Sequence, residues 1–466
     1  MKKYFALAMV ALLMTAGAAM AAPRGMEFIT PNATFATGSP STTNNDDSCD
    51  ISNQPAATLL LPVFEVDINA PATTAVNTVF TITNTSNIPQ IAHITLWTDW
   101  SFPVLDFNVF LTGYDVQGIS LYDVIVRGVL PGGGNQVGRG SLSANNTTGN
   151  VNFAPGAASA CANLPTQIPD SLQNDIRTAL TTGRTSGCSG FVGSANTLAT
   201  GYVTIDTGNT CSQSLPTDPL YYVNEILFDN TLIGDYQRIN PTSTVGNYAG
   251  GESLVPIRAI PEGGPAGFVP TNLPYTFYDR YTPDGLRTAD RRQPLPSLFA
   301  ARFIEGGTGE FNTEFAIWRE GVTRGTAGCA VSPNGALGIE EFIRFDEREN
   351  PSTTAGPPAI SPAPPNVASL PEASFTASTD SVFPPDVTTT SDTGGWMYMN
   401  LDNGGSTAYS SDRHSQNWVV VSMTAEGRYG VDFDASHLGN GCSPGATAGV
   451  RPIGPQPNDT GDGDFF

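Results

Sequence analysis

The strongest constraint on the fold is an alternation of apolar and polar residues with a period of two. In the segment 104–111, every second residue is apolar, namely Leu105, Phe107, Val109 and Leu111. The segment 92–100 also alternates, with one predicted face of Ala92, Ile94, Leu96 and Trp100 and another of His93, Thr95, Trp97 and Asp99. A spacing of two places alternate side chains on one side of a β-strand. We therefore predict half-buried strands of an antiparallel sheet.

Further segments are dense in β-branched and aromatic residues and are separated by short turn signals. These features predict additional strands at 58–68, 78–84, 90–100, 199–205, 221–228, 253–260, 311–318, 339–345, 395–401, 417–423 and 428–433. Many strands at such spacing are typical of sandwiches. The predicted fold class is all-β, with two antiparallel β-sandwich-like domains.

The predicted organisation has seven parts. Residues 131–197 form an insertion whose cysteines pin it by disulfides, and the segment 170–180 is its one short helix, with Asp170 as cap. The parts are a leader 1–21, an extended segment 22–55, a sandwich-like domain 56–265 with the insertion 131–197, a second β-rich domain 266–457 with a Pro-rich loop 356–371, and an acidic tail 458–466.

The N-terminus has the pattern of a secretory signal peptide. Lys2 and Lys3 precede an apolar run over 4–20, and Ala19-Met20-Ala21 supplies the small residues of a cleavage site. No later segment approaches the roughly 20 apolar residues that a spanning helix needs. We therefore expect a secreted protein, in the periplasm, at the cell surface or outside the cell, without a transmembrane segment after cleavage.

Cleavage would leave a mature chain without lysine, because Lys2 and Lys3 are the two lysines present. The 19 arginines then stand against 43 acidic residues, a formal net charge of −24. Nucleic acids and anionic membranes bind clustered cations, so neither is an expected partner. Phosphate-binding loops, Schiff-base lysines and kinase-like chemistry all require a lysine, and the mature sequence excludes them.

The six cysteines predict three disulfide bonds in an oxidising compartment. They are Cys49, Cys161, Cys188, Cys211, Cys329 and Cys442. No two are spaced as C-x-x-C, which disfavours zinc ribbons and thioredoxin-like redox sites. Three of them lie close together in sequence, at 161, 188 and 211, so at least one bridge must reach another region.

Familiar catalytic motifs are absent or broken. The segment Gly441–Gly445 matches the G-x-S-x-G pattern of a hydrolase, but Pro444 follows the serine and has no N–H for an oxyanion hole. His93, His414 and His437 are the whole supply of histidine, and none has a zinc-site spacing. No catalytic residue is assigned.

Paired carboxylates are the remaining route to hydrolysis, since a glycosidase needs two of them and no lysine or histidine. Acidic residues cluster at Glu305, Glu310, Glu314, Glu340, Glu341, Asp346, Glu347 and Glu349. Neighbouring arginines, at Arg319, Arg324, Arg344 and Arg348, favour a surface ion-pair network instead.

Tryptophans on predicted strands offer large, rigid apolar faces on which sugar rings can stack. They are Trp97, Trp100, Trp318, Trp396 and Trp418, and core packing is the usual role of such residues. Trp97 is the candidate ligand-binding residue because it is predicted on the polar face of its strand.

Two further features suggest binding. Asp459, Asp462 and Asp464 in the glycine-rich tail offer oxygen ligands for calcium, the one cofactor considered, but the tail lacks a full twelve-residue loop and a bidentate glutamate, which favours a solvated tail. A basic concentration at Arg280, Arg287, Arg291 and Arg292 suits either docking of a second copy or internal pairing.

The sequence therefore favours a secreted, non-catalytic structural or adhesive protein of the cell surface or extracellular space. A carbohydrate-binding module and a secreted glycoside hydrolase with paired carboxylates are the alternatives. The expected partners are a glycan or a second copy of the chain.

Overall fold

The computed structural model describes the chain from residue 55 to residue 438 with gaps. The described residues are 55–87, 89–99, 101–131, 164–182, 197–218, 221, 225–241, 248–259, 277–278, 292–296, 298–307, 311–319, 341–352, 373–377, 394–401, 416–425 and 429–438. The leader, the extended segment up to residue 54, the Pro-rich loop and the acidic tail are outside these ranges. No helix in the described part is long and apolar enough to cross a lipid bilayer.

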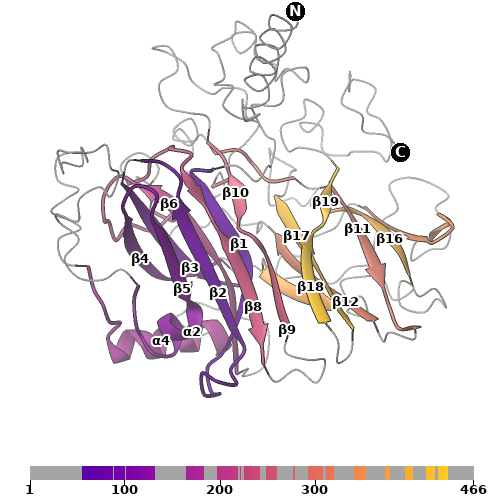
Figure 1. Ribbon diagram of the computed structural model, residues 1–466, viewed down its shortest axis with the longest axis horizontal. Helices are drawn as coiled ribbons and strands as arrows, with labels where there is room; N and C mark the ends of the chain where they lie inside the picture. Colours follow the sequence, from indigo (N-terminus) through magenta and orange to yellow (C-terminus); the bar gives the residue numbers. More distant parts are fainter. Residues whose placement is uncertain are drawn as a thin grey trace, which may run out of the picture.

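The N-terminal half contributes two antiparallel sheets (Figure 1). Sheet 1 has the order β10-β1-β6-β3-β4, with β10 (Val255–Ile257), β1 (Thr58–Asp67), β6 (Leu198–Gly208), β3 (Gln90–Thr98) and β4 (Pro103–Leu111). Sheet 2 has the order β5-β2-β8-β9, with β5 (Val116–Ser120), β2 (Asn77–Asn84), β8 (Asp235–Asn240) and β9 (Tyr248–Ser253), and β7 (Leu232–Ile233) also pairs with β2.

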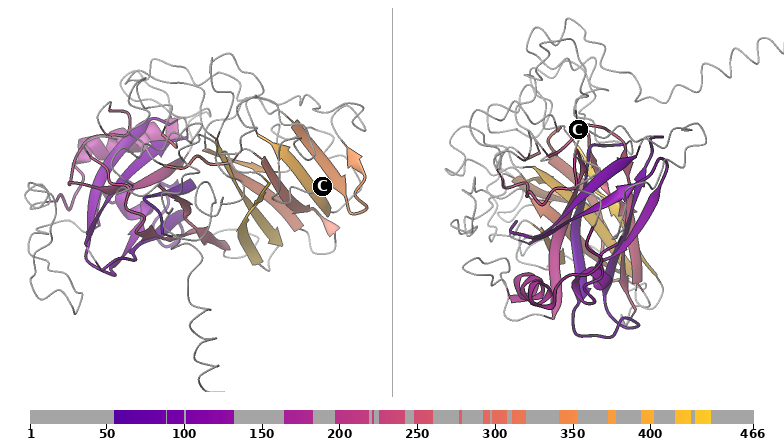
Figure 2. Two further views of the ribbon diagram at one scale, coloured as in Figure 1. Left: turned by 90° about the horizontal axis from the view of Figure 1, so that it is seen from above. Right: turned by 90° about the vertical axis from the view of Figure 1, so that its left-hand side faces the viewer.

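The C-terminal half contributes two more antiparallel sheets, which lie to the right in Figure 1 and in the left panel of Figure 2. Sheet 3 has the order β15-β12-β17-β18, with β15 (Ala373–Ala377), β12 (Phe311–Arg319), β17 (Asn417–Ala425) and β18 (Tyr429–Asp434). Sheet 4 has the order β14-β13-β16-β11-β19, with β14 (Pro351–Ser352), β13 (Glu341–Asp346), β16 (Gly394–Asn400), β11 (Leu298–Ile304) and β19 (Ser436–His437).

Two hydrophobic clusters hold the sheets together. The first lies between sheets 1 and 2 and includes Leu59, Ile94 and Phe80. The second joins sheets 3 and 4 and also takes in the other face of sheet 1, so that it includes both Leu60 and Val420. Because this second cluster reaches from β1 to β17, apolar packing is continuous between the two halves of the chain.

Sheet 1 is therefore covered on both faces, and the expectation of half-buried strands is wrong for β3. All nine of its residues are buried, including those on the predicted polar face. Period-two alternation is kept in β4 and in β2, where every second side chain is buried. The polar residues of β3 do not mark solvent here, because both faces of sheet 1 are covered.

The strand pattern predicts most of the fold. The predicted helix is present as α4 (Asp170–Thr182), although Leu172, expected on its apolar face, is 41% exposed. A second helix, α2 (Leu121–Ile125), was not predicted, and the Ser120 hydroxyl caps it by accepting from the Asp123 N–H. The expected strand at 221–228 is wrong, because its described residues make only one isolated bridge, between Gly208 and Ile226.

Cys211 is the one cysteine among the described residues, and it is not a free thiol. The other five lie outside the described ranges, so the disulfide pinning of the insertion stays a prediction. The domain boundary predicted at 265 also lies outside them.

A buried ion pair lies beside the second hydrophobic cluster, next to its residues Tyr221 and Tyr278. Asp206 on β6 and Arg292 are both 0% exposed, and a guanidinium nitrogen lies 3.3 Å from the Asp206 Oδ1 atom. The same oxygen accepts from the Thr58 hydroxyl at 2.5 Å. The second carboxylate oxygen of Asp206, Oδ2, accepts from the hydroxyls of Tyr221 at 2.7 Å and Tyr278 at 2.9 Å. Burial, followed by the nearby carboxylate, raises the pKa of Tyr221 well above its usual range.

We predict that Asp206→Asn destabilises the protein by about 3–5 kcal/mol, because it leaves the Arg292 charge buried without its counter-ion. Urea denaturation measures the change. Asp123→Asn is the control, since Asp123 pairs with Arg127 at 2.8 Å on the exposed surface, and its cost should stay below about 1 kcal/mol. Equal costs for the two variants would contradict this account of the buried pair.

Candidate ligand-binding groove

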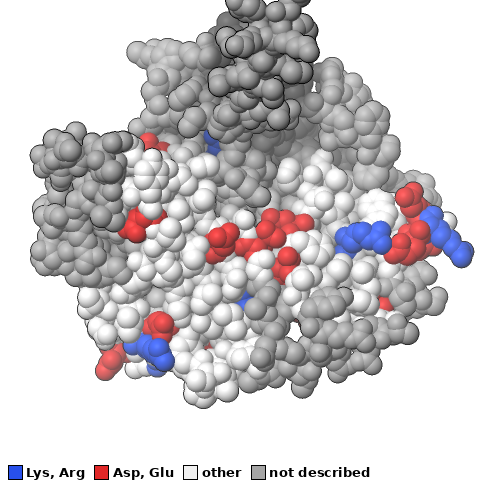
Figure 3. Space-filling view, viewed as in Figure 1, with Lys and Arg blue, Asp and Glu red and all other residues white. Residues whose placement is uncertain are grey.

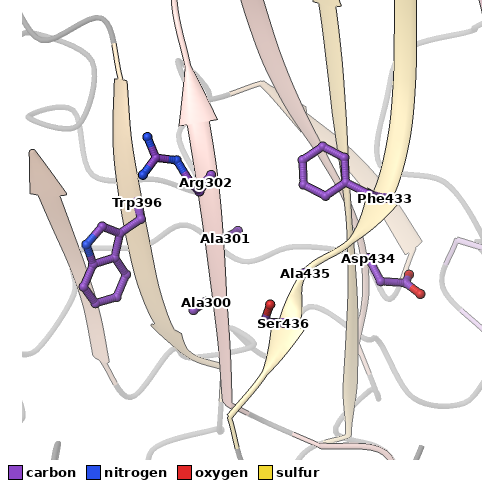
Figure 4. Close-up of a pocket in the computed structure, with 8 residues that line it drawn as sticks. All are labelled: Ala300, Ala301, Arg302, Trp396, Phe433, Asp434, Ala435 and Ser436. Atoms are coloured by element: carbon purple, nitrogen blue, oxygen red, sulfur yellow. The ribbon is translucent and has the colours of Figure 1, made fainter. Parts of the chain in front are cut away.

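A groove with a volume of about 290 Å³ opens on the C-terminal half (Figure 4). Residues of four strands line it. Strand β11 contributes the floor residues Ala300 and Ala301 and the rim residue Arg302; β16 contributes Trp396; and the passage from β18 to β19 contributes Phe433, Asp434, Ala435 and Ser436. Below, these eight residues are called the groove.

The groove exists because the chain changes sheets at Ala435. Strand β18 belongs to sheet 3 and β19 belongs to sheet 4. Strand β11 pairs with β16 from Leu298 to Ile304, but with β19 only at Phe299 and Ala300. Beyond Ala300 the strands β11 and β18 therefore diverge, and the alanine side chains between them are too small to fill the space.

An aromatic pair forms one wall. The rings of Trp396 and Phe345 are stacked, with centroids 3.9 Å apart and planes inclined by 6°. Trp396 is partly exposed, whereas its neighbour Met397 is fully buried. Strand alternation explains this difference, because Met397 faces the core while Trp396 faces outward. Phe345 thus holds a flat indole in place beside the alanine floor.

Two charged side chains stand at the ends of the groove. At the rim, the Arg302 guanidinium donates to Glu347 Oε1 at 2.6 Å, and both side chains are more than half exposed. Asp434 lies at the other end and accepts from the Trp418 indole N–H at 2.8 Å. Figure 4 shows its carboxyl group directed away from Trp396. Burial, with smaller effects from Glu252 and Asp432, raises the pKa of Asp434 to about 7.

Behind Asp434 lies an acidic seam between β1, β8 and β18. The Arg238 guanidinium donates to both oxygens of Asp432, at 3.0 and 3.1 Å, and to the Ser422 hydroxyl. Burial raises the pKa of Glu65 on β1, although the Arg238 charge opposes the shift. In Figure 3, acidic residues gather near the centre of this face of the protein.

The predicted ligand-binding residue Trp97 does not reach the surface. It is 0% exposed, its ring stacks on Tyr202 at 5.6 Å, and its indole N–H donates to the Thr204 hydroxyl at 2.8 Å. The expectation that it lies on a half-exposed face fails because the second cluster covers sheet 1. Trp318 and Trp418 are also buried, at 2% and 3% exposed. Trp100 lies outside the described residues.

Of the two histidines in the described residues, His93 is buried and His437 is exposed. His93 is 2% exposed and its Nδ1 atom lies 3.0 Å from the Asn108 side-chain oxygen. His437 is exposed at the end of β19, and its ring centroid lies 6.3 Å from that of Trp418. His414 is outside the described residues, as are the serine motif 441–445 and the calcium candidates Asp459, Asp462 and Asp464.

The described residues of the predicted charged clusters lie in different surroundings. Asp346 stays at the surface, where hydrogen bonds from Asn350 lower the pKa of its carboxyl. Of the arginine concentration, Arg292 is paired internally with Asp206. Arg280, Arg287 and Arg291 are outside the described residues. Within the described ranges, no three His, Cys, Asp or Glu side chains gather in a group that could hold a metal ion.

Most groove residues were missed at the sequence level. Strand β11 was not predicted, so Ala300, Ala301 and Arg302 had no assigned role. Trp396 was recognised as a strand residue, and the alternation in β16 carries the signal that distinguishes it, with Met397 and Met399 buried on one face. No family model, curated protein or solved structure matches this chain.

The raised pKa of Asp434 gives a pH dependence with a defined sign. Between the usual pKa of 3.8 for an aspartic acid and the raised pKa of about 7, the folded chain keeps a proton that the unfolded chain has lost. The contribution of Asp434 to the free energy of unfolding is therefore largest at low pH and falls as the pH rises towards 7.

We predict that the stability of the wild type relative to Asp434→Asn decreases between pH 5 and pH 8. Chemical denaturation of both proteins at the two pH values measures this difference. Asp235→Asn, at an exposed position of β8, is the control and should show no comparable trend. A difference for Asp434→Asn that does not change with pH would exclude the proposed titration.

Proposed function

We propose that the protein is secreted and non-catalytic, and that it acts at the cell surface or outside the cell by binding glycans through the groove. The observation that carries this proposal is the Trp396–Phe345 stack, which holds a partly exposed indole beside an open floor of alanines. A flat aromatic face suits the apolar face of a sugar ring. The signal-peptide pattern supports a location where glycans are abundant.

The shape of the groove supports the same proposal. Ala300 and Ala301 leave room for a ring beside Trp396, and Phe433 bounds the space on the other side (Figure 4). Arg302 and Ser436 provide hydrogen-bonding groups at the edge, which sugar hydroxyls require. Ligand sites commonly combine apolar walls with a few polar groups in this way.

A glycoside hydrolase is the second candidate, and one observation favours it. Asp434 has a pKa of about 7, as a general acid at neutral pH needs, and the carboxylates of Glu252 and Asp432 are near enough to influence it. The direction of its carboxyl group, away from Trp396, ranks this candidate below binding alone.

We predict that Trp396→Ala weakens glycan binding at least tenfold, because it removes the stacking face, and tenfold corresponds to about 1.4 kcal/mol. Affinity electrophoresis of the mature protein against soluble glucan, xylan, mannan and pectin measures binding. Trp396→Phe should retain most of the affinity. Trp97→Phe, a change at a buried indole, should bind like the wild type per folded molecule.

Two results would reject the proposal: binding by Trp396→Ala equal to that of the wild type, or no binding of any of these polysaccharides by the wild type. Release of reducing sugar that disappears in Asp434→Asn would instead support the hydrolase.

A further inference from the structure

The acidic seam behind the groove joins the two halves of the chain. It combines charged and hydroxyl side chains of strands from both halves. Those of the N-terminal half are Glu65 on β1, Arg238 on β8 and Glu252 on β9, and those of the C-terminal half are Glu314 on β12, Ser422 on β17, and Asp432 and Asp434 on β18. The carboxyl groups of this set outnumber its one arginine, so the acidic seam is short of positive charge.

The edges of two sheets meet at the acidic seam without pairing. Strands β9 and β18 lie side by side (Figure 1). Within the described part of the chain, β9 pairs with β8 alone and β18 pairs with β17 alone. The contact between β9 and β18 is therefore made by side chains and not by a ladder of backbone hydrogen bonds. Such a contact can open locally without breaking either sheet.

One guanidinium group spans the acidic seam. Arg238 donates to both carboxylate oxygens of Asp432, at 3.0 and 3.1 Å, and its Nη1 atom lies 3.8 Å from Glu65 Oε2. The side chains of Arg238 and Asp432 are 8% and 0% exposed. A buried pair of this kind depends on close geometry, because its attraction must offset the loss of hydration of both charges. Arg238 thus holds the two halves together only while the acidic seam stays closed.

The strand register places a second acidic group beside this pair. Glu314 on β12 is paired with Ser422 on β17, and Ser422 is paired with Asp432 on β18. Directly paired residues have their side chains on the same face of a sheet. The Ser422 hydroxyl donates to Asp432 Oδ1 at 2.5 Å. One face of sheet 3 therefore presents two carboxyl groups at the acidic seam.

The protonation of Glu65 depends on the C-terminal half. Burial is the largest effect that raises the pKa of its carboxyl group, and the charge of Arg238 opposes the shift. Glu314 and Asp432, which lie on the other side of the acidic seam, raise this pKa further. Withdrawal of the C-terminal half would therefore lower the pKa of Glu65, because both its burial and the repulsion would decrease.

The protonation of Asp434 depends on the N-terminal half in the same way. Burial raises the pKa of its carboxyl group to about 7, against the hydrogen bond from Trp418. Glu252 adds to the shift from across the acidic seam, and Asp432 adds to it from the same strand. Each half thus favours a proton on a carboxyl group of the other half. Opening of the acidic seam favours the release of both protons.

The remaining contact between the halves does not share this dependence on pH. The second hydrophobic cluster is continuous from Leu60 to Val420, and the buried pair of Asp206 and Arg292 lies beside it. Apolar contacts carry no charge, so their strength does not follow the pH. This region can therefore serve as a hinge while the edges of β9 and β18 separate.

We propose that the acidic seam is a pH-sensitive joint between the two halves, closed while Glu65 and Asp434 hold their protons and open between β9 and β18 once both protons have passed to the solvent. The open form binds fewer protons, so a rise in pH favours it by mass action. The equilibrium constant of opening then increases by up to about tenfold per pH unit for each proton released. The joint does not depend on glycan binding, although Asp434 also lines the groove.

We predict that the amides of β9 and β18 lose protection against hydrogen exchange, by about tenfold or more, between pH 5 and pH 8. Mass spectrometry of the wild type measures this loss, with each rate divided by the intrinsic rate at the same pH. Exchange of β9 and β18 should hardly change in urea up to about 1 M, because local opening exposes little surface, whereas exchange of the enclosed strand β3 should accelerate with urea.

Removal of the two titrating groups tests their role in the joint. In the double variant Glu65→Gln with Asp434→Asn, the protection of β9 and β18 should change by less than about twofold over the same pH range, because no proton is left to release. Asp235→Asn, at an exposed position of β8 outside the acidic seam, is the matched control and should keep the pH dependence of the wild type. Asp434→Asn alone should remove the share of one proton, which keeps the test available if the double variant does not fold.

Three results would overturn the proposal. The first is protection of β9 and β18 in the wild type that does not change with pH. The second is exchange of these strands that accelerates with urea as strongly as that of β3, since the whole protein would then be unfolding. The third is a double variant that keeps the pH dependence of the wild type.

Discussion

The structure depends on a charged pair in its apolar interior. Asp206 extends from β6 in sheet 1, and Arg292 reaches it from the segment that leads into the C-terminal half. Breaking such a pair is costly because one buried charge would remain alone. The two tyrosine hydroxyls and the Thr58 hydroxyl on the same carboxylate complete its hydrogen bonding. The pair thus favours one arrangement of the two halves over other apolar packings.

The same packing explains where a ligand can and cannot bind. Sheet 1 is enclosed on both faces, so its aromatic residues, Trp97 and Tyr202, serve the interior. Sheet 4 presents Trp396 on its outer face, next to the point where the chain passes from sheet 3 to sheet 4. The groove is a consequence of that passage, since two strands that separate leave a space that alanines do not fill.

The sequence predicts strands well where a segment alternates between apolar and polar residues or is a run of apolar, β-branched residues. The alternation in 104–111 and the apolar runs of β1, β12 and β17 lead to nearly correct boundaries. Prediction of burial from the sequence fails where the element that covers a strand is distant in the chain. Burial of His93 and Trp97 depends on residues after 200, and the groove depends on β11, whose run of Leu298–Ile304 has no alternation between apolar and polar residues.

The order of strands in sheet 1 has a consequence for how the chain folds. Strand β1 lies between β6 and β10, and the hydrogen-bonded Thr58 and Asp206 are 148 residues apart. The central sheet therefore cannot close until more than half of the chain is available. Contacts at such separation slow the search for the native state and leave strand edges open in the meantime. A chain built in this way should fold slowly, and if it is secreted as we propose, slow folding would keep it unfolded during export.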